Sequence, residues 1–188
     1  MRGAPPIRPQ RAPIFIGCEG LSEMGYAGWL RNIVRDRDLP FHLELSDLGR
    51  GAGDPLTRID LAMDRIRRME GNREPFIGRF LFLDTDQLVT KSAREQARRR
   101  ADDDDITVIW QDPTHEAFLL RHFPARVTHR PPTKQAADTA LAKEWVGYEK
   151  PCTAQQIESK LELAGAHRVA GNLPELAALL RTIQLLDG

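Results

Sequence analysis

Ile14-Phe15-Ile16-Gly17-Cys18-Glu19-Gly20 and Arg79-Phe80-Leu81-Phe82-Leu83-Asp84-Thr85-Asp86 decide the fold of this 188-residue chain. Each stretch is a short apolar run that ends abruptly in acidic residues. Such runs, bounded by turn signals, are typical of strands buried on both faces, as in parallel sheets. Because the functional crevice of an open α/β sheet lies outside the carboxyl ends of its strands, Glu19, Asp84 and Asp86 are candidate site residues.

These three acids have two interpretations. Taken singly, each is explained by turn formation, since Asp is common in loops and caps. Taken together, carboxylates placed at one sheet edge by two neighbouring strands would form a hard-oxygen site suited to Mg²⁺. Closely placed carboxylates repel each other and raise each other's pKa unless a cation or a proton intervenes. The joint pattern favours a metal site, provided that the first and third strands are adjacent.

The chain from residue 12 to about 123 alternates strands with helices. Strands are expected at 12–18, 41–45, 78–83 and 106–110, and helices at 22–35, 55–69, 90–101 and 114–122. This order predicts a mainly parallel four-stranded sheet with helices on both faces. We divide the chain into a flexible basic N-terminus (1–11), an α/β domain (12–125) and a helical C-terminal extension (126–188), with helices expected at 133–146, 153–165 and 173–187.

Composition sets broad limits on function. The chain has 27 basic and 27 acidic side chains, so only a local patch could argue for a nucleic-acid partner. Its two cysteines fit neither a disulfide framework nor a zinc spacing, which indicates a reducing compartment. No apolar run approaches the length of a membrane span, and no signal-peptide core follows the start. We therefore expect a cytoplasmic protein without a membrane association.

Two basic segments are candidate phosphate contacts. Arg50 lies in the loop Gly49-x-Gly51-x-Gly53, whose backbone N–H groups could approach phosphate oxygens, although a simple connector explains the glycines equally well. Arg94 and Arg98 are four residues apart on one helical face and could hold a polynucleotide backbone. A solvated helix is the favoured alternative there, because Asp102 to Asp105 follow at once.

Asp112 and Glu116 follow the fourth strand. Asp112 is explained as a helix cap, with Glu116 in the first turn of that helix. Because this strand also ends at the carboxyl edge, Glu116 could instead supply a fourth carboxylate to the crevice. His115, His122 and Lys150 are individually weak signals.

The combination resembles the Toprim domain, which is shared by topoisomerases, primases and OLD-type nucleases. Within this group the chain resembles the RloB-like family, which is linked to restriction loci and phage defence. The residues that carry this resemblance are a strand ending in Cys18-Glu19-Gly20, then Glu23 and Tyr26, and a later block from Trp110 to Phe123. The resemblance covers roughly residues 12–160. The chain departs from the family pattern at four positions: Asp112 replaces the usual Asn, His115 replaces Phe, Phe118 replaces Trp, and Gln87 stands where an acid often follows Asp-x-Asp.

The resemblance implies a role for each candidate. Glu19 would act as general acid/base or metal ligand, and Asp84 and Asp86 would bind Mg²⁺ or Mn²⁺. Glu116 would complete the cluster, and Lys150 would face phosphate. Phosphodiester cleavage needs a divalent ion that neutralises developing charge and activates water, and a cluster of carboxylates can bind such an ion. The chemistry of these residues therefore agrees with the roles that the resemblance implies.

Three functions follow as hypotheses. The first is a metal-dependent nuclease in phage defence, acting on DNA or RNA. The second is a non-catalytic sensor or assembly module of a defence system. A receiver-like phosphotransfer domain is the third, but the lysine-bearing fifth strand of that fold is missing. The sequence holds no ATPase motif, so an energy-dependent action would require an ATPase or another defence-system protein as partner.

Overall fold

The computed structural model describes residues 10–49, 53–71, 73–88 and 90–187, so Arg50 and most of the predicted basic N-terminus lie outside the described residues. Four parallel strands form one sheet in the order β2-β1-β3-β4: β1 (Ala12–Cys18), β2 (Phe41–Asp47), β3 (Gly78–Asp84) and β4 (Thr107–Gln111). The predicted parallel α/β fold is confirmed. β1 and β3 are adjacent, with Cys18 opposite Phe82, so Glu19, directly after β1, lies beside Asp84, the last residue of β3.

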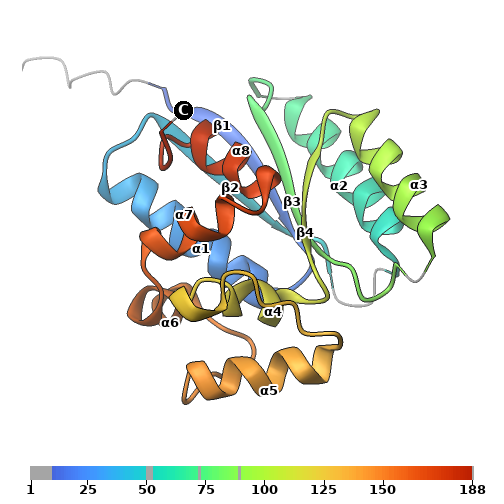
Figure 1. Cartoon of the computed structure of the whole chain (residues 1–188). Coiled ribbons are helices and arrows are strands. Elements are labelled where there is room, and N and C mark those ends of the chain that lie inside the picture. The colour runs from blue at the N-terminus through green and yellow to red at the C-terminus, as the bar shows by residue number, and fades with distance from the viewer. Residues whose placement is uncertain (1–9, 50–52, 72, 89, 188) are drawn as a thin grey trace, which may run out of the picture.

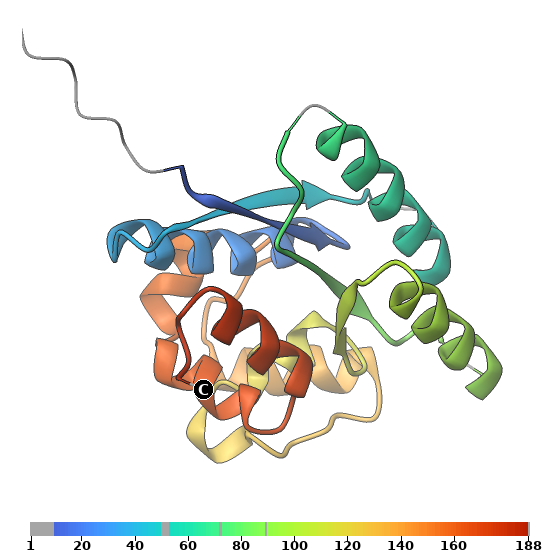
Figure 2. The ribbon, with the colours of Figure 1, turned by 90° about the horizontal axis from the view of Figure 1, so that it is seen from above.

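Helices cover both faces of the sheet. The first four are α1 (Leu21–Asp36), α2 (Pro55–Glu70), α3 (Lys91–Asp102) and α4 (His115–Leu120). After the short 3-10 turn η1 (Pro124–Arg126) come α5 (Lys134–Glu144), α6 (Ala154–Lys160), α7 (Leu163–Ala170) and α8 (Pro174–Thr182). Figures 1 and 2 show α2 and α3 on one side of the sheet and α1, α7 and α8 on the other, with α4 and α5 near one end of the strands. Within the described ranges, no helix is long and apolar enough to cross a membrane.

Two hydrophobic clusters lie on opposite faces because strand side chains alternate. Ile14 and Ile16 pack with α1 and the C-terminal helices, whereas Phe15 packs with α2 and α3. Leu176 and Leu180 of α8 are fully buried in the first cluster. The C-terminal extension therefore shares a core with the α/β region.

Side-chain caps start four of the eight helices in the described ranges, α2, α3, α5 and α6. The Asp54 carboxylate accepts the Thr57 N–H at 3.1 Å, and Pro55 occupies the first turn of α2. A capping box starts α6, where Thr153 and Gln156 satisfy each other's backbone N–H groups. These caps fix the helix positions that the sequence predicts.

The predicted helix 153–165 is wrong. The chain forms α6 and α7 instead, because Leu161 and Glu162 adopt extended backbone between them. Leu161 is buried in the core there, so apolar periodicity continues across a break in the backbone. The predicted helices 114–122 and 173–187 are also too long, since α4 ends at Leu120 and α8 ends at Thr182.

Candidate active site

A cavity of about 350 Å³ opens at the carboxyl ends of β1 and β3, next to the first turns of α1 and α4. Its lining combines carboxylates with cations: Glu19, Gly20, Leu21, Ser22, Glu23, Arg58, Asp84, His115, Glu116, Lys134, Lys150 and Pro151. This end of the sheet lies beside α4 and α5 in Figure 1. The structure thus brings Glu19, Asp84, Glu116 and Lys150 of the predicted site into one cavity.

Glu19 is held by two neighbours. One carboxylate oxygen, Oε2, accepts the backbone N–H of Asp84 at 2.9 Å, which ties the end of β1 to the end of β3. The other, Oε1, lies 3.2 Å from Nη2 of Arg58, a buried guanidinium on α2. Burial raises the pKa of Glu19 above its ordinary value, although the Asp84 N–H and Arg58 both act to lower it.

Asp84 is the most perturbed carboxylate of the cavity. Burial, followed by the charges of Glu23, Glu19, Glu116 and Asp86, raises the pKa of Asp84 to about 9. Its Oδ1 atom is buried and has no hydrogen-bond partner. Such a group is stabilised by a proton at neutral pH, or by a cation that replaces the proton.

Glu116 is the best-satisfied carboxylate. Its Oε1 lies 2.7 Å from Nζ of Lys150 and accepts the Tyr148 hydroxyl at 3.2 Å, while Oε2 accepts the Thr114 hydroxyl at 3.0 Å. Burial acts to raise the pKa of Glu116, but the hydrogen bond from Lys150 and the nearby charges bring it below its ordinary value. Glu116 is therefore a buried anion neutralised by a lysine of the C-terminal extension.

The remaining predicted residues lie outside the cavity lining. Asp86 is exposed beyond β3, although its charge raises the pKa of both Glu19 and Asp84. Arg94 donates from Nε to the Leu88 carbonyl at 3.0 Å and lines a smaller hollow of about 130 Å³ together with Asp112. That hollow lies at the same sheet edge, on the β4 side of the Asp84 loop.

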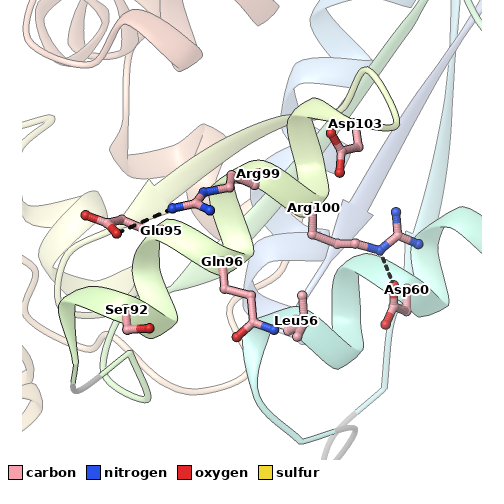
Figure 3. A pocket seen from close by; sticks show the side chains of 8 residues that line it. All are labelled: Leu56, Asp60, Ser92, Glu95, Gln96, Arg99, Arg100 and Asp103. Atoms are coloured by element: carbon pink, nitrogen blue, oxygen red, sulfur yellow. Dashed lines mark hydrogen bonds and ion pairs between the residues drawn. The ribbon is translucent and has the colours of Figure 1, made fainter.

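A larger hollow of about 420 Å³ lies between α2 and α3 (Figure 3). Its charges compensate one another: Arg100 pairs with Asp60 at 2.7 Å, and Arg99 pairs with Glu95 at 3.7 Å. No strand-end carboxylate lines this hollow. The strand-end carboxylates lie instead in the cavity of about 350 Å³ at the ends of β1 and β3.

The donor set suits a hard divalent cation, because carboxylate oxygens dominate it and Asp84 Oδ1 lacks a partner. Within the described ranges, however, no three His, Cys, Asp or Glu side chains are arranged as a ready-made metal cage. The reason is visible in the contacts, since Glu19 faces Arg58 and Glu116 faces Lys150. A bound cation would have to compete with those two internal cations.

Sequence reasoning missed Arg58 and Lys134 as cavity residues, treated His115 only as a weak signal, and did not place Glu23 among the candidate site residues. Arg58 lies on the buried face of α2, directly before Ile59, and this break in an apolar stripe was the available signal. His115 is buried, with Nδ1 2.6 Å from Gln111 and its Nε2 atom without a partner. Lys134 starts α5, and only the tertiary fold brings it to the cavity.

Comparison with protein-family models, with curated proteins and with solved structures finds no match to this chain. The function is therefore argued from the geometry of the cavity.

Proposed function

We propose that the chain is a metal-dependent nuclease that cleaves nucleic-acid phosphodiesters. The observation that carries this proposal is Asp84, a half-buried strand-end carboxylate with one buried and unpartnered oxygen, in a cavity that also contains cationic side chains. An electron-rich oxygen cluster suits a divalent cation, and lysines beside it suit the phosphate of a substrate. This pairing of chemistries is what phosphodiester hydrolysis requires.

Asp84, Glu19, Asp86 and Glu116 are the residues that would hold Mg²⁺ or Mn²⁺. When bound, the ion supplies charge neutralisation at the phosphate and activation of water. Glu19 is suited to exchange a proton with the reacting groups, because its pKa lies above that of an ordinary glutamate. Arg58 fixes the Glu19 carboxylate, and Lys150 and Lys134 would neutralise the substrate phosphate.

The biological setting rests on the resemblance to RloB-like Toprim proteins. It supports phage defence as the role, a cytoplasmic location, and an ATPase or another defence-system protein as partner. Arg94 and Arg98 lie at the same sheet edge as the cavity and would extend the contact with a polynucleotide. Arg50, in the glycine-rich loop before α2, would add a further phosphate contact.

The test uses purified protein with labelled tRNA, single-stranded DNA and duplex DNA, each with Mg²⁺, Mn²⁺ or EDTA. Cleavage is expected with a divalent ion and not with EDTA. Asp84→Asn should lose cleavage while remaining folded, because this carboxylate lies at a strand end rather than in a hydrophobic cluster. Asp60→Asn, in the α2–α3 hollow, is the matched control and should cleave as the unsubstituted protein does.

A non-catalytic sensor or assembly module is the second candidate. The observation that favours it is the internal compensation of the cavity, where Arg58 and Lys150 already neutralise Glu19 and Glu116. Such a site is stable without a metal ion. The absence of any thermal response to Mg²⁺ or Mn²⁺, together with intact folding, would favour this module over the nuclease.

A further inference from the structure

Lys150 lies between two carboxylates. Its Nζ atom is 2.7 Å from Oε1 of Glu116 and 2.8 Å from Oδ1 of Asp138. Glu116 belongs to the first turn of α4 and is buried, whereas Asp138 lies on α5, outside the cavity lining, with a half-exposed side chain. The ammonium group therefore has one partner inside the site and a second one at its border.

Because of this arrangement, both metal binding and phosphate binding must compete with the Glu116–Lys150 ion pair. A divalent cation that uses Glu116 must take that carboxylate from Lys150. A substrate phosphate that uses Lys150 must take the ammonium from Glu116. Asp138 offers the ammonium an alternative acceptor when Glu116 is occupied, so the exchange leaves no charge without a partner.

We propose that the Glu116–Lys150 ion pair is a switch that couples metal binding to phosphate binding. In the free protein each residue blocks the other; metal on Glu116 releases Lys150 for the phosphate, and phosphate on Lys150 releases Glu116 for the metal. By thermodynamic linkage the two ligands then raise each other's affinity by the same factor. This inference rests on the proposed function, because it takes the ligands to be a divalent ion and a nucleic-acid phosphate.

The cavity contains a matched control for each partner. Lys134 lines the same cavity, and within the described ranges it makes no ion pair. Glu23 also lines the cavity, and in the described part of the chain its ion-pair partner is His115, 3.9 Å away, rather than Lys150. A purely long-range charge effect would appear equally in the control variants, whereas an exchange of partners would appear only at Glu116 and Lys150.

The experiment measures Mg²⁺ affinity by calorimetry without nucleic acid, and affinity for a short labelled oligonucleotide by fluorescence anisotropy in EDTA. Lys150→Met should tighten Mg²⁺ binding by about three- to tenfold, because Glu116 loses its competing cation, whereas Lys134→Met should change it by less than about twofold. Glu116→Gln should tighten oligonucleotide binding in EDTA, and by more than Glu23→Gln does. Asp138→Asn should weaken Mg²⁺ binding, since Lys150 then keeps Glu116 as its single acceptor.

Unchanged or weaker Mg²⁺ binding by Lys150→Met overturns the switch, as does an equal gain from Lys134→Met. Oligonucleotide binding that Glu116→Gln tightens no more than Glu23→Gln also overturns it. If Glu116→Gln unfolds the protein, Asp138→Asn still tests the switch, because Asp138 is half-exposed and its substitution should leave the fold intact. If the opposing shifts occur but no nucleic acid is cleaved, the switch stands and the nuclease proposal falls. If cleavage occurs without these shifts, the nuclease stands and the switch falls.

Discussion

Asp84→Asn should stabilise the metal-free protein. Burial and the surrounding carboxylates raise the pKa of Asp84 from 3.8 to about 9, so the folded chain keeps a proton at pH 7 that the unfolded chain has lost. Each pH unit between these values lowers the free energy of unfolding by about 1.4 kcal/mol. At pH 7 the penalty is on the order of 2–4 kcal/mol, and asparagine avoids it because it cannot ionise.

For a chain of this length, such a gain raises the melting temperature by about 5–15 °C. The sign is fixed by the direction of the pKa shift: stability of the unsubstituted protein falls as pH rises from about 4 to about 9. The Asn variant should lose this part of the slope. Thermal melts at several pH values in EDTA measure both effects. Asp54→Asn is the control, since this cap of α2 is exposed and the variant keeps the capping oxygen.

A divalent metal ion should offset this difference in stability between the two proteins. Mg²⁺ at about a hundred times its dissociation constant adds roughly 2.7 kcal/mol to the unsubstituted protein, and Asp84→Asn should lose most of this response. Because the ion must displace the Asp84 proton, its affinity should rise about tenfold per pH unit below pH 9. Calorimetry in buffers of different ionisation enthalpy counts the released proton. A less stable Asn variant with pH-independent metal affinity would refute the reasoning.

The other predictions concern packing around α1. Gly25→Ala should destabilise the protein by several kcal/mol, because the added Cβ would lie 2.0 Å from the backbone oxygen of Cys152. Gly28→Ala should destabilise it much less, because its Cβ would meet only the Cβ of Ala154 at 3.3 Å, and urea unfolding compares the two variants. Tyr26→Phe should cost about 1–3 kcal/mol, since the Tyr26 hydroxyl lies 2.9 Å from Nε2 of buried His122 and its loss leaves that atom unpaired. A Tyr26→Phe melting curve that overlays the parent would contradict this assignment.

The sequence predicts the sheet and half of the site for a clear reason. β1 and β3 are apolar runs that end in acid, so Glu19 and Asp84 are positioned by their own strands. Their adjacency then follows from the strand order. The sequence does not predict that Arg58 and Lys134 line the cavity, because they lie on helices whose orientation depends on tertiary contacts. A basic residue in a helix is ordinarily a solvated one, and only the fold shows that Arg58 is buried against Glu19.

The C-terminal helices show the same limit. Apolar periodicity continues from α6 into α7, and the break at Leu161 and Glu162 carries neither Gly nor Pro. Core packing of Leu161 decides where the first helix ends. Periodicity alone therefore joins two helices that the tertiary structure separates.

The shared core of α1 and α8 has a consequence for the order of events during synthesis. When the ribosome has released the chain only through α4, the four carboxylates of the cavity lining have been synthesised, but Lys134 and Lys150 have not. At that stage the apolar face that α8 later covers on β3 and β4 is open to chaperones. The two lysines reach the cavity, and α8 covers the apolar face of β3 and β4, only after the C-terminal helices have been synthesised. The lining of the cavity is therefore complete only after the segment that carries Lys134 and Lys150 has been synthesised.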